Sequence, residues 1–310
     1  MWLYQAQWFA GRNRNASGKF SLMMDVTIDE FVRHLDDERG LAANTLAAYR
    51  SDLLQFEEFV RGSRYQGWDV PPKLVREFMS DLVHREYRQT SQARKLAAVK
   101  ALYRYLKLNK KVVNDPTTGL GGAPVAKRRP QVISTSDVER LLEEAADPST
   151  PEEMRDRAML ETLYATGLRV SELVALDLEA VDAGFQRVTL GRATSRSRTV
   201  PLNERAGEAL RVYIDDGRTK LLRQADEPAV FLNHRGKRLT RQGFWLIVKA
   251  YASRARIEKT ITPHTLRHSF ATHRLQGEGN VREIQELLGH ASSSTTKVYA
   301  ELAREAREGV

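Results

Sequence analysis

Each of two segments in the second half of the chain contains an arginine three residues away from a glutamate or a histidine. These residue types suit chemistry on a phosphate. Arg169 follows Gly167 closely and precedes Glu172 by three residues. His264 and Arg267 lie one turn apart on one face of an expected helix that begins at Pro263. A guanidinium donates a forked pair of hydrogen bonds, so two arginines could stabilise a charged phosphate without a metal ion.

A third segment places a histidine and a tyrosine nine residues apart. His290 follows Gly289 at the expected end of one helix, and Tyr299 lies inside the next. A tyrosine hydroxyl is a nucleophile only where a base or nearby cations favour its phenolate, because its pKa in water is near 10. Each residue alone also has an ordinary structural interpretation, as a surface ion pair, a helix cap or a core aromatic. Their occurrence together in one domain favours a reactive site.

The histidine spacing also permits a metal site, which the intervening residues disfavour. His264 and His268 are spaced i,i+4, and His273 and His290 follow. The residues between the first pair are Thr-Leu-Arg, so a cation stands where a zinc hydrolase helix carries its glutamate. The chain also has no cysteine and no GxxxxGK[ST] phosphate loop. We therefore expect chemistry without metal, ATP or any other cofactor. A histidine-dependent metallohydrolase is the alternative.

Composition indicates a two-domain protein and is compatible with a polyanionic partner. The chain has 310 residues, a net charge of +9, and no apolar run of the roughly 18 residues that span a bilayer. Residues 1–130 contain 22 basic and 14 acidic residues, whereas residues 131–310 contain 27 and 26. A basic first part suits binding to nucleic acid, although it is also compatible with a merely soluble surface. The absence of cysteine fits a cytoplasmic location.

The first part of the chain predicts a four-helix bundle. Residues 1–24 lack a helical period and are expected to form a disordered extension. Thr27 and Glu30 form a predicted capping box that starts the first helix. Three further helices are expected up to residue 115, and one face of the last carries several cations: Arg94, Lys95, Lys100, Arg104 and Lys107. Residues 116–131 are rich in Gly and Pro and are predicted to be the interdomain linker.

Residues 132–310 predict a mainly helical α+β domain. Ser134 or Ser136 can cap its first helix, and a second helix ends at Gly167. Residues 186–202 alternate in the manner of a β-hairpin, which predicts a small antiparallel sheet. Further helices are expected near 204–223, 240–255, 263–277, 280–288 and 292–307.

Three blocks, TGLRVSEL, HTLRHSFATH and LLGHASSSTTKVY, resemble the signature of tyrosine site-specific recombinases and phage-type integrases, among them the Xer recombinases. The similarity extends from about residue 26 to 303 and includes NTLAAYRSDLLQFEEFV, which resembles the family's SAM-like core-binding domain. It implies that Tyr299 is the nucleophile and that Arg169 and Arg267 clamp the phosphate. His264 and His290 would then lie beside the phosphate, with His264 the better candidate for the base, and Glu172 would support Arg169.

The resemblance implies cleavage and rejoining of duplex DNA through a 3′-phosphotyrosyl bond, by a homo- or hetero-tetramer on two synapsed sites. Chromosome dimer resolution and integration or excision of a mobile element both fit. One departure concerns the hairpin turn, where the family usually has a lysine that acts as general acid and this chain has Arg192. Two alternatives follow: a DNA-binding member of the same fold with impaired strand transfer, and a topoisomerase-like relaxing enzyme.

Overall fold

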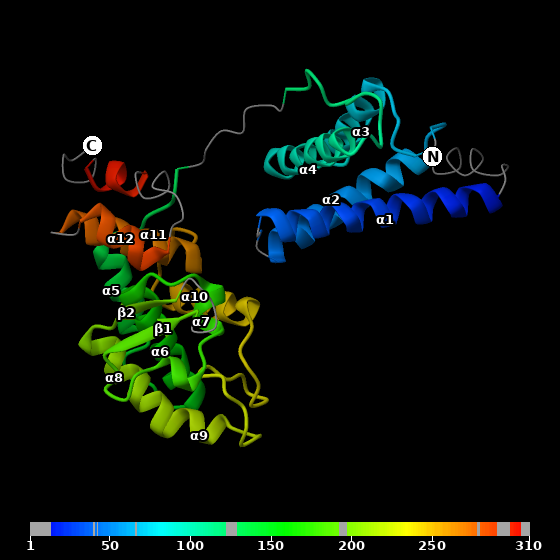
Figure 1. Ribbon diagram of the computed structural model, residues 1–310. Coiled ribbons are helices and arrows are strands. Elements are labelled where there is room, and N and C mark those ends of the chain that lie inside the picture. The colour runs from blue at the N-terminus through cyan, green and yellow to red at the C-terminus, as the bar shows by residue number, and fades with distance from the viewer. Residues whose placement is uncertain are drawn as a thin grey trace, which may run out of the picture. The chain divides into compact units, whose positions relative to one another are not determined.

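The structure is a computed structural model of the whole chain (Figure 1). It describes residues 14–39, 41, 43–65, 67–121, 129–191, 197–277, 280–289 and 298–304, with only the backbone for residues 14–23 and for Arg39. The described residues are mainly helical and include a two-stranded antiparallel sheet, as the sequence predicted. They divide into two compact units, Met1–Lys127 and Arg128–Val310. The division falls inside the predicted linker.

The described residues of unit 1 form a bundle of four helices around a core rich in aromatic rings. Its helices are α1 (Arg14–Arg39), α2 (Ala43–Arg61), α3 (Pro72–His84) and α4 (Gln89–Leu108). α2 packs against α1, α3 and α4 (Figure 1). The ring of Phe56 makes edge contacts with those of Phe78 and Tyr103, at centroid distances of 5.0 and 6.2 Å. The predicted four-helix bundle is confirmed.

The predicted start of the first helix at Thr27 is wrong. α1 begins at Arg14, so Thr27 and Glu30 lie inside the helix and form no cap. The buried stripe of α1 also begins before Thr27, because Met24 belongs to the same core as Ile28 and Phe31. The helix therefore continues through a segment whose own sequence lacks a clear period, and Met24 packs in the core before the predicted start. Residues 1–13 of the expected extension lie outside the described residues.

One lysine of the predicted basic face of α4 is not on the surface. Lys95 is buried, and its Nζ donates to Oδ1 of Asp52 on α2 at 2.8 Å. Arg94 donates to the other carboxylate oxygen of Asp52 at 2.5 Å. The carboxylate of Asp52 is 1% exposed and is stable there only with charged donors. Arg94 and Lys95 supply them and so connect α4 to α2. Arg104 and Lys107 are exposed, as expected.

Unit 2 is built around α6 (Pro151–Thr166), whose buried residues lie on all sides of the helix. It packs against several of the other elements. These elements are α5 (Thr135–Glu143), α7 (Val170–Val174), α8 (Glu204–Val212), a π-helical turn (Tyr213–Gly217), α9 (Arg218–Leu221) and α11 (Pro263–Gln276). A 3-10 turn (Leu178–Ala180), α10 (Arg241–Arg254) and α12 (Val281–Leu288) complete the named helices, and residues 298–304 are helical.

The small sheet of unit 2 is a hairpin of β1 (Arg187–Leu190) and β2 (Arg198–Pro201), with Val188 opposite Val200. Both of these valines are buried, so this face of the hairpin points toward the core. The sequence predicted the hairpin, and it also predicted that either Ser134 or Ser136 would cap α5. The Ser134 side chain accepts from the Asp137 backbone N–H at 3.1 Å, as expected. The hairpin and α6, α7, α11 and α12 position the residues considered next.

Candidate active site

Arg169 is presented by a sharp turn between α6 and α7. α6 ends at Gly167, whose φ of +60° is the left-handed conformation that glycine adopts without strain. A Cβ atom at this position would lie 2.2 Å from the ring of Phe270 on α11. The chain then reaches Arg169, whose backbone N–H donates to Glu172 at 2.8 Å while its Nη1 donates to the same carboxylate at 3.0 Å. A glycine is therefore required for the chain to turn here against α11.

Glu172 connects Arg169 to a second arginine, Arg198 on β2. Arg198 Nη2 donates to both carboxylate oxygens of Glu172, at 2.9 Å each. Burial tends to raise the pKa of Glu172, but the backbone N–H of Arg169 and the charge and hydrogen bonds of Arg198 outweigh it and hold this pKa below its usual value. Glu172 is therefore ionised at neutral pH and holds both guanidiniums.

Arg267 is the most deeply buried of the three arginines, at 4% exposure. It lies on α11, which begins at Pro263 as predicted and is capped by Thr262. Its Nη1 donates to the carbonyl oxygen of Gly167, and its Nη2 donates to that of Leu288 at 2.8 Å. Burial and the nearby charge of Arg169 lower the pKa of Arg267 to about 10, so the group is still a cation at neutral pH.

The three arginines converge on the carboxyl end of α12. Arg198 Nε donates to the Leu287 carbonyl oxygen at 3.1 Å and Arg169 Nη2 to that of Gly289 at 3.1 Å, while Arg267 donates to the carbonyl between them. The last carbonyls of a helix have no partner within the helix and carry its negative partial charge. Three cations therefore hold the end of α12, directly before His290. Gly289, with a φ of +61°, ends α12 as the sequence predicted.

Tyr299 is buried beside these arginines, with 1% of its surface exposed. It packs in a small core with residues of α11 and α12, among them Phe270 and Leu288. Its hydroxyl lies 2.7 Å from Nδ1 of His268. Burial raises the pKa of Tyr299, and the charges of Arg267 and Arg169 act in the opposite direction. The hydroxyl of Tyr299 is therefore protonated at neutral pH, and the charges of both arginines favour its phenolate form.

His268 is neutral at physiological pH. Burial, together with the nearby His264 and Arg267, lowers its pKa to about 4. In the tautomer that carries its proton on Nε2, Nδ1 of His268 accepts the hydrogen bond from the hydroxyl of Tyr299. His264 is exposed and its ring stacks on that of His268, with centroids 6.5 Å apart.

Models of known families match most of the chain. The model of the phage integrase family matches residues 131–306, and that of the phage integrase N-terminal SAM-like domain matches residues 28–110. The chain belongs to the phage integrase family. It is a tyrosine recombinase, an enzyme of the class that cleaves and rejoins DNA through a tyrosine intermediate.

Relatives of this recombinase include Xer proteins from several bacteria. A tyrosine recombinase XerC from Roseiflexus sp. is 46% identical over 282 residues, which cover 90% of each chain. A tyrosine recombinase XerD from Vibrio vulnificus is 41% identical over 281 residues, covering 90% of this chain and 91% of its own. Among solved structures, the XerH site-specific recombinase bound to a palindromic difH substrate has the same fold. It is 19% identical, with a TM-score of 0.72, covering 94% of this chain and 93% of its own.

The structure brings together five of the residues that the sequence proposed for this recombinase's site: Arg169, Glu172, His264, Arg267 and Tyr299. The other two, Arg192 and His290, lie outside the described residues. The sequence analysis did not single out Arg198 or His268 for the reaction. The alternation of β2 could have indicated Arg198, because it lies two residues before the buried Val200 and so shares its inward face.

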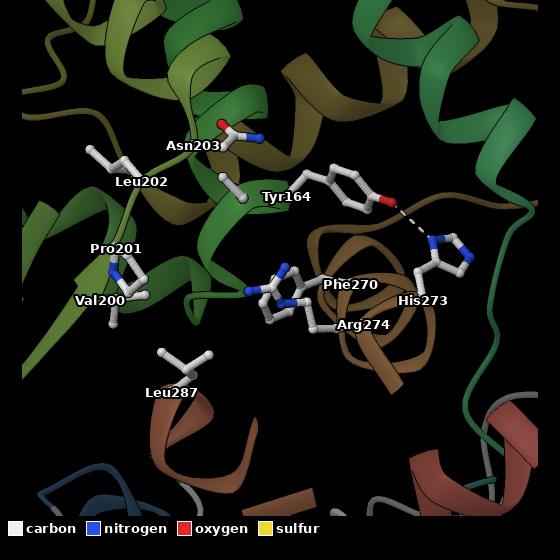
Figure 2. Close-up of a pocket in the computed structure, with 10 residues that line it drawn as sticks. Tyr164, Val200, Pro201, Leu202, Asn203, Phe270, His273, Arg274 and Leu287 are labelled. Carbon is white, nitrogen blue, oxygen red and sulfur yellow. Dashed lines mark hydrogen bonds between the residues drawn. The ribbon is translucent and has the colours of Figure 1, made fainter. Parts of the chain in front are cut away.

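His273 is structural in the recombinase rather than a metal ligand. Its Nε2 faces the carbonyl oxygen of Ile133 at 3.0 Å and therefore carries the proton. Nδ1 accepts from the hydroxyl of Tyr164 at 2.9 Å, at one end of a cavity of about 350 Å³ between α6, β2, α11 and α12 (Figure 2). Both ring nitrogens are thus in use. Among the side chains that the structure describes, no three His, Asp or Glu residues are grouped as metal ligands would be.

Within the described residues, the recombinase has no helix that is both long enough and apolar enough to cross a bilayer.

Proposed function

We propose that this recombinase acts on specific sites in duplex DNA and that Tyr299 is its nucleophile. One observation carries the proposal: Tyr299 is buried where the charges of Arg169 and Arg267 both act on its hydroxyl. The two guanidiniums are held in place by Glu172 and by the end of α12, so they are organised before DNA arrives. Preorganised donors of this kind are the main source of transition-state stabilisation in many enzymes.

In the proposed step, the phenolic oxygen of Tyr299 forms a bond to the phosphorus as the bond from phosphorus to the 5′ oxygen breaks. His264 takes the proton of the phenol as the base, and the 5′ oxygen leaves as a hydroxyl after it gains a proton from Arg192. Arg169 and Arg267 stabilise the extra negative charge on the non-bridging oxygens. His264 and His290 lie beside the phosphate in this proposal, and Arg192 lies at the leaving oxygen. The phosphotyrosyl bond conserves the energy of the broken bond, so rejoining needs no ATP.

The test uses nicked suicide substrates that carry candidate sites and detects a covalent protein–DNA adduct on a denaturing gel. The wild-type protein is expected to form the adduct in the presence of EDTA. Tyr299→Phe is expected to form none while binding DNA with unchanged affinity, because only the attacking oxygen is removed. An adduct in the Tyr299→Phe variant would place the nucleophile elsewhere. Relaxation of a supercoiled plasmid that lacks any site would favour a topoisomerase-like activity instead.

We propose chromosome dimer resolution in the cytoplasm as the biological role, rather than integration or excision of a mobile element. The support is the similarity to XerC and XerD proteins over about nine-tenths of the chain. Recombination between two candidate chromosomal sites would be assayed with this protein alone and with a second recombinase from the same genome. The first condition tests a homotetramer and the second a heterotetramer. Recombination only at mobile-element ends would contradict the role.

The proposed tetramer requires a contact between neighbouring subunits, which we assign to the carboxyl-terminal segment. The helical residues 298–304 contain the proposed nucleophile, and a head-to-tail exchange of the segment after them would close a ring. Deletion of residues 304–310 is expected to weaken the pairing of two DNA sites more than binding to one site, measured by gel shift. Equal losses in both would contradict this assignment.

A further inference from the structure

The contact between His268 and Tyr299 gives the nucleophile a hydrogen-bond partner outside the proposed phosphate clamp. The Nδ1 to hydroxyl distance of 2.7 Å is that of a well-formed hydrogen bond, and the two rings are 5.4 Å apart. The sequence favoured His264 as the base. The histidine that contacts the hydroxyl of Tyr299 is instead His268, one turn further along α11. His268 directly follows Arg267, so α11 carries both one of the two proposed clamp arginines and the histidine that contacts the hydroxyl of Tyr299.

The direction of this hydrogen bond determines where the lone pairs of the tyrosine oxygen point. A phenol that donates its proton to His268 has a fixed hydroxyl orientation, and its oxygen lone pairs face away from that ring. Attack requires a lone pair aimed at phosphorus, so fixing the hydroxyl removes a rotation that would otherwise be lost in the transition state. The acceptor also satisfies a hydroxyl that would be costly to bury alone.

We propose that His268 is a positioning residue that holds the hydroxyl of Tyr299 by its proton and thereby aims the oxygen at the phosphate. This role rests on the proposed function of Tyr299 as nucleophile. It requires an acceptor at the position of Nδ1, and it requires neither the imidazole ring nor a second exchangeable proton. Those requirements distinguish hydrogen bonding from packing and from proton transfer.

Two substitutions separate hydrogen bonding from packing, because one keeps only the acceptor and the other keeps only the ring. His268→Asn keeps an acceptor one bond beyond Cγ, as Nδ1 is, but loses the ring. His268→Phe keeps a ring of similar size but loses the acceptor. The exposed loop residue His234 provides the control, as His234→Phe. Each variant is compared with the full-length wild type in single-turnover cleavage of the suicide substrate, across a range of pH, and in DNA binding.

The expected result is a cleavage rate at least about tenfold lower for His268→Phe, and within about threefold of wild type for His268→Asn, on the scale of a lost orienting contact. DNA binding is expected to be unchanged, and the pH profile of His268→Asn is expected to match that of wild type. Three outcomes would overturn the proposal: normal cleavage by His268→Phe, an equal loss in both variants, or an altered pH profile in His268→Asn.

A measurement without DNA provides an independent test. His268→Phe removes this hydrogen bond from a buried hydroxyl, so it is expected to lower the midpoint of thermal unfolding. In a Tyr299→Phe background the hydroxyl is absent, and the same change is expected to have little effect. An equal drop in both backgrounds would contradict the hydrogen bond. If Tyr299→Phe still formed the covalent adduct, the proposed role of Tyr299 as nucleophile would fail. If His268→Asn and His268→Phe behaved alike in cleavage, only the proposed role of His268 would fail.

Discussion

Arg198 donates to both carboxylate oxygens of Glu172 at 2.9 Å and, through Nε, to the carbonyl oxygen of Leu287 at 3.1 Å. This arginine thus connects the hairpin, the turn that carries Arg169 and the end of α12. Its removal would leave a half-buried carboxylate and a helix-end carbonyl short of partners. Through these contacts, a residue of β2 helps to fix the positions of the arginines that are proposed to bind the phosphate.

We therefore expect Arg198→Ala to lower the free energy of unfolding by about 1–3 kcal/mol, the usual cost of unpaired buried groups. Cleavage is expected to slow as well, because Arg169 loses its fixed neighbour. Arg187→Ala provides the control on the same hairpin, since Arg187 is exposed and lies 3.8 Å from Asp182. Thermal unfolding and adduct formation measure the two effects. Equal behaviour of both variants would contradict the linking role of Arg198.

Arg169→Ala and Arg267→Ala are each expected to raise the activation barrier for cleavage by about 2.7–4 kcal/mol, the usual effect of removing one preorganised donor. The two variants should differ in stability, because the side chain of Arg169 is 41% exposed whereas Arg267 is buried against the carbonyl oxygens of Gly167 and Leu288. Arg267→Ala should therefore lower the unfolding midpoint more than Arg169→Ala. EDTA should change neither rate. Cleavage within about threefold of wild type for either variant would rule out the clamp.

Gly167→Ala is expected to destabilise unit 2 by roughly 1–3 kcal/mol through backbone strain, with a further cost from the clash with Phe270. The strain arises from the φ of +60°, and the new Cβ would lie 2.2 Å from the Phe270 ring. Gly62→Ala is the control, because its Cβ would meet only ordinary contacts at 3.5 Å and beyond. Denaturant unfolding measures both variants. Phe270→Ala in the Gly167→Ala background should lessen the additional loss, which tests the clash separately.

The depressed pKa of His268 predicts a loss of stability toward acid. Burial, His264 and Arg267 lower this pKa from 6.5 to about 4, so between these values the unfolded chain binds a proton that the folded chain does not. Stability therefore falls as the pH falls through this window, by at most about 3 kcal/mol from this residue. His268→Asn should show a shallower fall between pH 7 and 4 in denaturant titrations. Identical slopes in wild type and variant would contradict the shift.

Arg192→Lys is expected to speed cleavage of ordinary DNA. Lysine releases its proton near 10.4 and arginine only above about 12.5, so arginine is the weaker acid by about 2 units or more. Proton transfer in the transition state is partial, so the gain should be smaller than the full difference of roughly 3 kcal/mol. On a 5′-phosphorothiolate substrate, whose leaving group needs no proton, both proteins should cleave at similar rates. A neutral or slower lysine variant on ordinary DNA would remove Arg192 from this role.

The sequence by itself determined the fold class, the helix ends at Gly167 and Gly289, a serine cap at Ser134 or Ser136 and the hairpin. These features depend on local chemistry: the left-handed conformation of glycine, the capping oxygen of serine and a period of two. It also named the residues proposed to clamp the phosphate, through short motifs that resemble those of a known family. The continuation of α1 before Thr27 and the burial of Lys95 were missed, because packing against other helices overrode the local pattern.

Only the tertiary structure decided which groups face one another at the site. Arg198 and Glu172 are 26 residues apart, and His268 and Tyr299 are 31 apart, so no local period relates the members of either pair. Whether a histidine binds metal, holds a carbonyl or accepts from a tyrosine depends on the elements that pack around it. The sequence therefore named the reactive residue types, whereas the packing of α6, α11, α12 and the hairpin assigned their partners.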